Sequence, residues 1–181
     1  DKWLSEYKEI YINSNTPQEE IQTAQKISYM DKNISQKCFL DLNDQEVRVD
    51  SYKDKPLVFV VAWQQNNEDV RKWNLKLKEK FFGNNQIVIQ GLGSIPPLPN
   101  FLTSDFIKKQ LEIVQKEIGI IWLDWDSKFI KGDLNLVLGK KTIIIGVNGN
   151  GVIKFIEEEF FSEDRLNFIY DKINSNLLED G

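Results

Sequence analysis

Hydrophobic and polar residues follow different patterns along the chain, and each pattern predicts one kind of element. Residues 57–62 (LVFVVA) are apolar without interruption, which is typical of a strand covered on both faces, so we expect this strand to be central in a β-sheet. Beyond a polar turn, apolar residues recur every three or four positions until Gly83, which predicts a helix of about four turns. The residues of this repeat are Val70, Trp73, Leu77 and Phe81.

A second strand and helix follow the first pair. Residues 86–90 (QIVIQ) predict a buried strand, and residues 91–104 (GLGSIPPLPNFLTS) predict a long loop before the next helical repeat. Residues 118–129 (IGIIWLDWDSKF) predict a strand that ends in an acidic turn, and residues 141–156 predict two strands joined by an Asn-Gly type turn. A last helix is expected behind Ser162, which suits an N-cap. The two later helical repeats are Ile107, Leu111, Val114 and Ile118, and then Leu166, Ile169, Ile173 and Leu177.

The segment before the central strand predicts a two-stranded ribbon. Within residues 38–52, Val47 and Val49 alternate with charged residues, and Asn43 and Asp44 mark the turn between two short strands. One face of this ribbon is therefore expected to be polar.

The N-terminal residues predict an additional helix. Thr16 can cap it, Pro17 suits its first position, and Glu19 completes a Thr-x-x-Glu capping box. We expect residues 1–35 to form an N-terminal helical extension and residues 36–181 to form one domain, because 181 residues with 41% hydrophobic content suffice for one good core.

Composition excludes several classes of function. The net charge is -5, and the 23 basic residues lie scattered among 28 acidic ones, so nucleic acid is not an expected partner. No apolar stretch approaches the roughly 18 residues of a membrane span, so we do not expect an integral membrane protein. The sequence has no histidine, which excludes imidazole-based triads and histidine-ligated metals. No cofactor or metal site is expected.

Cysteine usage excludes a further class of chemistry. Cys38 is the only cysteine, and one thiol cannot form an internal disulfide, a CxxC pair or a thiolate metal cluster. The chain begins at Asp1 without a methionine, from which we expect that a preceding segment such as a secretion signal was removed. The expected location is periplasmic or otherwise extracytoplasmic.

The order of the elements resembles that of thioredoxin, with strand, helix, strand and helix followed by a hairpin and a closing helix. Residues 39–63 (FLDLNDQEVRVDSYKDKPLVFVVAW) resemble the start of the redoxin branch of the thioredoxin superfamily, where a short acidic hairpin and a Gly-Lys-Pro-like turn precede the central strand. Residues 123–129 and 139–153 resemble its later half, and the similar segments together span residues 38–178. The loop at 91–101 and the missing active-site cysteines are most similar to the periplasmic YtfJ-like proteins.

This resemblance implies a fold and a site. The fold is an α/β thioredoxin-like three-layer arrangement, in which a central mixed β-sheet is flanked by helices and carries an N-terminal β-ribbon and an extra N-terminal helix. The positions that match the active-site cysteines are Gln64 and Asn67, and the position that matches the cis-proline is Lys141. Neither amide can act as a nucleophile, and the Pro-x-x-x-Thr-x-x-Cys pattern of peroxiredoxins is absent. The resemblance therefore implies a protein without a redox centre and without catalytic residues.

The turn at residues 64–67 has two interpretations. As a binding turn, its amides and the free N–H groups of the following helix would meet a peptide backbone or a small anion. As a structural turn, Asn66 or Asn67 would cap the helix, Glu68 and Asp69 would favour its positive end, and the glutamines would face water.

The long loop at residues 91–104 also has two interpretations. It joins the C-terminal end of a parallel strand to a helix, which is where open α/β sheets place ligand crevices, so we expect it to overhang the turn at 64–67. Its three prolines stiffen it, and its apolar residues either bind a partner or cover the end of the sheet. These apolar residues are Ile95, Leu98, Phe101 and Leu102.

Three residues offer alternative chemistry. Cys38 is either a redox thiol that works with an external thiol or a small, partly buried hydrophobe at a strand start. Asp124 and Asp126 are either carboxylates of an unidentified enzyme, one of them the general base, or parts of a solvated turn. They lack the ligand spacing of an EF-hand.

The sequence thus favours a redox-inactive, non-enzymatic protein of a bacterial cell envelope that binds a protein or peptide. The candidate binding residues come from the turn, the loop and the position that matches the cis-proline. They are Trp63, Gln64, Gln65, Asn66, Asn67, Ile95, Pro96, Phe101 and Lys141.

Overall fold

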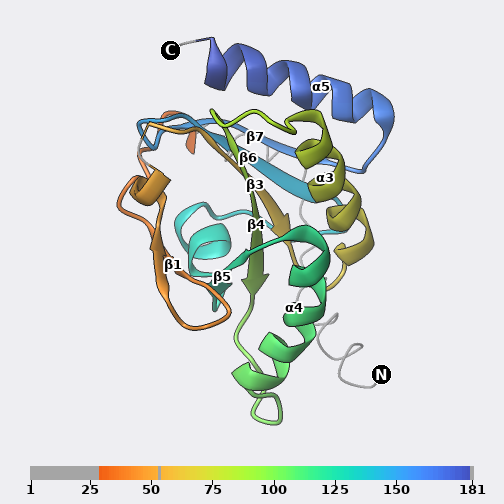
Figure 1. The fold of residues 1–181 in the computed structure, drawn as a ribbon. Coiled ribbons are helices and arrows are strands. Elements are labelled where there is room, and N and C mark those ends of the chain that lie inside the picture. The colour runs from red at the N-terminus through yellow and green to blue at the C-terminus, as the bar shows by residue number, and fades with distance from the viewer. Residues whose placement is uncertain (1–28, 53, 180–181) are drawn as a thin grey trace, which may run out of the picture.

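The computed structural model describes residues 29–52 and 54–179 (Figure 1). The helix predicted from Thr16 and most of the extension at residues 1–35 lie outside the described residues. Within them, one sheet has the strand order β2-β1-β5-β4-β3-β6-β7. The strands are β1 (Cys38–Leu40), β2 (Glu46–Arg48), β3 (Leu57–Ala62), β4 (Val88–Ile95), β5 (Ile121–Trp125), β6 (Thr142–Val147) and β7 (Ile153–Glu159).

The sheet is mixed. Strands β3, β4 and β5 are parallel, whereas β6 runs antiparallel to β3, and β1 runs antiparallel to β5. The expected hairpins are present, because β1 pairs with β2 and β6 pairs with β7. Three α-helices follow strands: α3 (Asn67–Lys80), α4 (Ser104–Ile118) and α5 (Glu163–Ile173). The shorter helical segments are η1 (Val49–Tyr52), η2 (Lys128–Asp133) and η3 (Asn174–Leu178).

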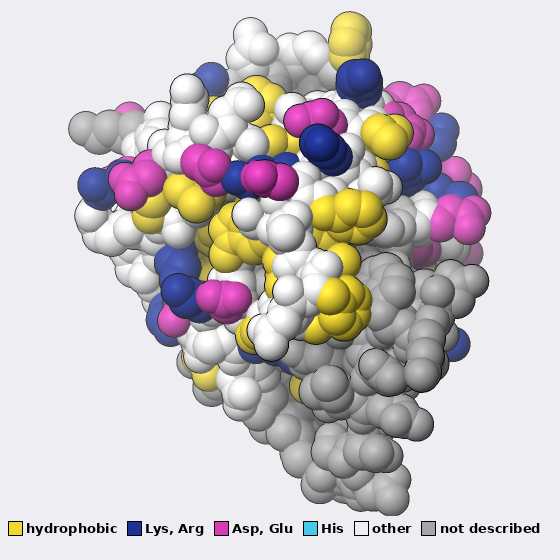
Figure 2. All heavy atoms as spheres, turned by 90° about the horizontal axis from the view of Figure 1, so that it is seen from below, with side chains coloured by type: hydrophobic (Ala, Val, Ile, Leu, Met, Phe, Trp, Pro, Cys, Tyr) yellow, Lys and Arg dark blue, Asp and Glu magenta, His cyan; other side chains and the backbone are white. Residues whose placement is uncertain are grey.

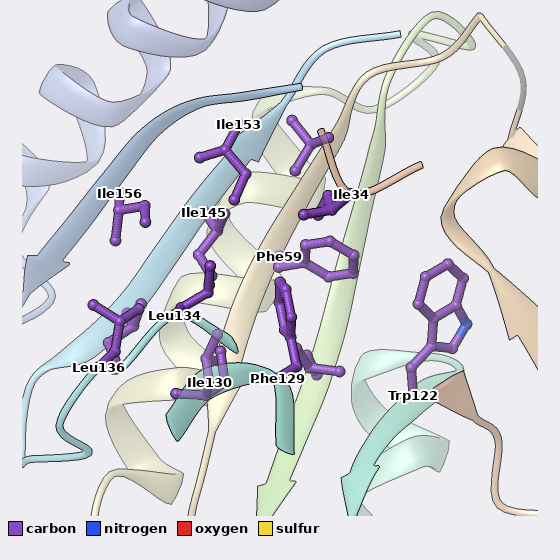
Figure 3. Close-up of a cluster of buried hydrophobic side chains, with 14 of the residues drawn as sticks. Ile34, Phe59, Trp122, Phe129, Ile130, Leu134, Leu136, Ile145, Ile153 and Ile156 are labelled. Carbon is purple, nitrogen blue, oxygen red and sulfur yellow. The ribbon is translucent and has the colours of Figure 1, made fainter. Parts of the chain in front are cut away.

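Strand β3 separates two apolar clusters. Val58 and Val60 pack with residues of α3 and α5 on one face, while Phe59 and Val61 pack on the other face with η2 and the residues after it. On this second face, side chains from β3, β5, β6 and β7 point toward one another (Figure 3). The rings of Phe39 and Phe129 have centroids 5.3 Å apart in an edge-to-face arrangement. The central, doubly covered strand predicted from LVFVVA is therefore confirmed.

The helices α3, α4 and α5 lie on the same side of the sheet, and the other side is covered by η2 and the segments near it (Figure 1). The mixed sheet with flanking helices is thus as expected, although a short π-type turn takes the place of a full α-helix on the second face. No helix within residues 29–52 and 54–179 is both long enough and apolar enough to cross a bilayer.

Strand β4 is longer than the sequence pattern predicts. Residues 91–95 were expected in the loop, but they continue the strand and pair with Ile121–Trp125 of β5. Gly91 and Gly93 suggested a loop, but both residues pair with β3 and β5. The loop is therefore confined to residues 96–103.

The interpretation of Asp124 as part of a solvated turn is wrong, because this residue is only 3% exposed. Its carboxylate accepts hydrogen bonds from the main-chain N–H groups of Phe129 (2.9 Å) and Ile130 (3.0 Å), which begin η2. The Ser94 hydroxyl lies 3.2 Å from the same carboxylate and 2.8 Å from the hydroxyl of Ser127. Asp124 therefore holds η2 against the end of β4, which is a structural role and not that of an exposed general base.

The buried carboxyl makes stability depend on pH. Burial raises the pKa of Asp124 above its ordinary value of 3.8, because desolvation penalises the charged form. The folded state then binds the proton more tightly than the unfolded state, so the stabilising contribution is complete below pH 3.8 and is lost as the pH rises through the raised pKa. We expect the free energy of unfolding of the wild type, relative to that of Asp124→Asn, to fall between acidic and neutral pH.

Urea unfolding of both proteins over this pH range measures the difference. At acidic pH, Asp124→Asn should be less stable by about 1–3 kcal/mol, because the amide nitrogen cannot accept a hydrogen bond, whereas the second oxygen of a protonated carboxyl group keeps some acceptor capacity toward the main-chain N–H. The control is Asp126→Asn, since Asp126 is exposed on the same turn and its substitution should change stability by less than about 0.5 kcal/mol at every pH. A difference between wild type and Asp124→Asn that stays constant with pH would contradict the assignment.

Candidate functional site

A groove of about 320 Å³ lies where β3 and β4 end. Its walls are the turn after β3, the end of β4, the loop at residues 96–102 and the first half of α4. The turn at 64–67 and the loop therefore meet at one site, as expected from the sequence. The lining residues are Ala62, Trp63, Gln64, Asn67, Gly93, Ser94, Ile95, Pro96, Leu98, Leu102, Phe106, Ile107, Gln110 and Leu111.

None of the described residues that line the groove carries a charge. In the view from the end of the molecule where α4 begins, hydrophobic side chains gather across the middle of the surface, and charged side chains lie above them and to the left (Figure 2). The polar groups of the groove are the amides of Gln64, Asn67 and Gln110, which both donate and accept hydrogen bonds, together with Ser94. The groove therefore suits a neutral ligand with apolar surface.

The groove meets the sheet at two small residues. Ala62 and Gly93 are partners in the β3–β4 register, and they lie on the face of the sheet that the helices cover. A Cβ on Gly93 would lie 3.5 Å from Leu123 Cδ2, which is ordinary van der Waals contact, so the strand has room for a Cβ there. The hollow exists in part because neither residue fills it.

Among the residues that the structure describes, the end of β4 has a strand partner on one side only. The ladder between β3 and β4 ends at Ala62 and Gly93, whereas the ladder between β4 and β5 continues to Ile95 and Trp125. The Ile95 carbonyl oxygen accepts from the main chain of Ser127, on the β5 side. Main-chain groups of successive strand residues point alternately to the two neighbouring strands. The main chain of Ser94 therefore points to the side where β3 has ended.

Asn66 closes the turn instead of capping the helix. It stands at the N-cap position of α3 but makes no side-chain cap bond, so the expected cap is wrong in this respect. Its buried side-chain oxygen accepts from the main-chain N–H of Trp63 at 2.9 Å. Its amide nitrogen lies 3.3 Å from the carbonyl oxygen of Val61 and 3.4 Å from that of Lys141. One side chain thus joins the end of β3 to the start of β6.

Three further hydrogen bonds fix the wall formed by the turn and α3. The Trp63 indole N–H donates to the carbonyl oxygen of Gly139 at 2.7 Å. Asp69 accepts from the Thr142 hydroxyl at 2.6 Å and from the main-chain N–H of Phe161 at 2.8 Å. Sequence reasoning assigned Asp69 only to the helix dipole, because its two partners lie far along the chain. The start of α3 is therefore held against β6 and the end of β7.

The nine candidate binding residues divide into two groups. Five of them line the groove: Trp63, Gln64, Asn67, Ile95 and Pro96. The other four do not line it: Gln65, Asn66, Phe101 and Lys141. Sequence reasoning missed the groove face of α4, which contributes Phe106, Ile107, Gln110 and Leu111. The helical repeat marked Ile107 and Leu111 as apolar, but nothing in it shows that they face a groove.

Phe101 and Lys141 have other surroundings. Phe101 is 63% exposed at the tip of the loop, outside the groove. The Lys141 ammonium lies 5.9 Å from the centre of the Phe160 ring, and only its carbonyl oxygen contacts the turn. No cis peptide bond occurs within residues 29–52 and 54–179.

Cys38 begins β1, as expected, but its thiol is exposed and not partly buried. The reason is the alternation along β1, because Phe39 points into the core and turns its neighbour outward. Cys38 does not line the groove.

The fold is similar to that of several solved structures. The thioredoxin domain of a thiol-disulfide oxidoreductase from Bacteroides vulgatus matches with a TM-score of 0.55 and 17% identity, covering 80% of this chain and 98% of that one. A putative protein disulfide isomerase from Bacteroides thetaiotaomicron has a TM-score of 0.60 and 13% identity, covering 83% and 91%. The exposed lipoprotein thioredoxin of Streptococcus pneumoniae has a TM-score of 0.57 and 11% identity, covering 75% and 98%.

No protein-family model and no curated protein matches the sequence. At identities of 9–17%, similarity to solved structures shows the fold alone. Together with the strand order and the flanking helices, it confirms that the chain has the α/β thioredoxin-like fold expected from its sequence.

Proposed function

We propose that this protein is a redox-inactive thioredoxin-like module that binds an uncharged, mainly apolar peptide segment of another protein in the groove between the turn at 64–67 and α4. The observation that carries this proposal is the lining of the groove, which has no charged residue among those that the structure describes, although 28% of the chain is charged. A partner recognised there gains from burial of apolar surface and from neutral hydrogen bonds.

A peptide fits this lining better than a wholly apolar molecule does. The amides of Gln64, Asn67 and Gln110 match the donor and acceptor groups of a peptide backbone. The side chains of Leu98, Phe106 and the other apolar residues of the loop and α4 match apolar side chains. This combination of main-chain and side-chain recognition is typical of peptide-binding grooves.

The residue types in the turn at 64–67 support the proposed absence of redox activity. The neighbours in structure include thiol-disulfide oxidoreductases, and we align their active-site cysteines with Gln64 and Asn67 at the start of α3. An amide at either position supplies no thiolate. The loop after β4 and the missing cysteines support a closer relation to the YtfJ-like proteins, and we place the protein in a bacterial cell envelope. The exposed lipoprotein among the similar structures agrees with that location.

Selection from a random peptide library displayed on phage tests the binding function directly. We expect the purified protein to enrich uncharged peptides that are rich in apolar residues. Phe106→Asp should weaken the binding of an enriched peptide by about tenfold or more in fluorescence anisotropy, because a bound peptide would desolvate the new carboxylate.

The matched control lies on the same helix. Ile113 is 61% exposed and does not line the groove, so Ile113→Asp makes the same kind of change outside it and should leave affinity unchanged. Enrichment of charged peptides, no enrichment at all, or equal losses in the two variants would each overturn the proposal.

The vestigial turn gives a second expectation. The wild type should not catalyse the reduction of insulin disulfides by dithiothreitol, whereas Gln64→Cys with Asn67→Cys should fold and form a disulfide across the start of α3. The helix dipole and free N–H groups should bring the pKa of the new thiol below its ordinary ~8.5, although Glu68 and Asp69 oppose this. Insulin reduction should stay poor, because Lys141 stands where the family has proline.

Mass spectrometry with thiol alkylation measures the disulfide, and Cys38→Ser in every variant removes the native thiol from the assay. The double serine variant, Gln64→Ser with Asn67→Ser, controls for the loss of the two amides. Insulin reduction by the wild type, or a cysteine pair that stays reduced under oxidising conditions, would contradict the alignment of the turn.

A further inference from the structure

We infer that the bound segment is an extended strand, which adds to the sheet beside Ser94 and places one large apolar side chain against Ala62 and Gly93. This inference rests on the proposed function and names how the same groove selects its partner. The occupant is an uncharged, extended segment of a partner protein.

The main chain supports strand addition. β4 continues beyond the last residue of β3, and the main chain of Ser94 points to the vacated side. The Ser94 hydroxyl is engaged by Asp124 and Ser127, so its main chain is the part of this residue left to a ligand. The carbonyl oxygen of Ser94 is the next acceptor in the ladder after the Ala62–Gly93 pair. An N–H group of an extended peptide can donate to it, as in other cases of strand addition to a sheet.

The small residues support a side-chain pocket. Ala62 and Gly93 are neighbours across the ladder and leave a hollow on the face covered by the helices. Side chains of an extended peptide alternate between the two faces of a sheet, so a strand placed beside Ser94 directs alternate side chains into this hollow. Ile107 and Leu111 of α4 line the other side of it. The pocket therefore selects size and apolar character at one position of the ligand.

The neutral lining disfavours other classes of ligand. Phosphate-bearing partners such as nucleic acids and anionic lipid headgroups are bound through lysine and arginine, and neither type lines the groove within residues 29–52 and 54–179. The unpaired main chain at Ser94 likewise matches a polypeptide and not an acyl chain, which has no hydrogen-bonding groups along its length.

Chemical scanning of one enriched peptide tests the main-chain contact. Each amide of the peptide is N-methylated in turn, which removes one donor and keeps the side chain. We expect one N-methyl group to weaken binding by about tenfold, with its neighbours on either side having much smaller effects, because main-chain groups of a strand alternate in direction. A uniform effect along the peptide, or none, would overturn strand addition.

A size exchange tests the pocket. The parent peptide is compared with a version in which its large apolar anchor is replaced by alanine, and we expect the wild-type protein to prefer the parent by about tenfold or more. Gly93→Leu fills the hollow and should remove this preference by weakening only the parent peptide. Gly93→Ala is the control, because its Cβ makes only ordinary contacts and should retain most of the preference.

The results of these experiments distinguish a failure of the proposed binding function from a failure of the proposed side-chain pocket. If no peptide binds at all, the proposed function fails. If peptides bind but Gly93→Leu weakens the parent and the alanine version equally, the side-chain pocket is wrong and the binding function stands. Should Gly93→Leu fail to fold by circular dichroism, Ala62→Leu makes the same test from the opposite strand, and the N-methyl scan needs no variant.

Discussion

Strand β3 is covered on both faces and paired along both edges. The position at which this strand ends determines where the turn at 64–67 and the groove lie. Its side chains divide between two apolar clusters, so the chain can leave the sheet only where a turn satisfies its main-chain groups. Asn66 provides that turn by bonding to the main chain of Val61 and Trp63 at the end of β3 and to the carbonyl oxygen of Lys141, the residue before β6. β4 continues past this point, and the groove lies beside its last residues.

Elements with long regular patterns could be predicted from the sequence, and those that depend on distant partners could not. LVFVVA and the repeat from Val70 to Phe81 each specify an element by local pattern alone. Residues 91–95 contain two glycines and resemble a loop, and their pairing with β3 and β5 makes them a strand. Asp124 is a second example. An acidic turn is normally solvated, but this carboxylate is buried and accepts a hydrogen bond from the main chain at the start of η2.

The candidate site also has parts that local sequence patterns predict and parts that depend on distant contacts. The turn and the loop could be placed together in advance, because the C-terminal ends of parallel strands share one edge of a sheet. Phe106 and Gln110 could not be assigned, since a helix residue faces solvent or a groove according to how the helix packs. Phe101 and Lys141 were chosen by position in the loop and by family resemblance, and both lie outside the groove lining. Proximity along the chain did not predict which side chains share a surface.

Ser94 takes part both in a buried hydrogen-bond network and in the lining of the groove. Its hydroxyl is part of the buried network of Asp124 and Ser127, while its main chain lies at the groove. A contact made through the main chain survives any side-chain replacement that preserves the strand, so the residue type at this position reports the packing of the core and not the choice of ligand. Over evolutionary time, the side chain at this position can change without loss of the main-chain contact, whereas the small residues Ala62 and Gly93 are where a change would alter the hollow beside it.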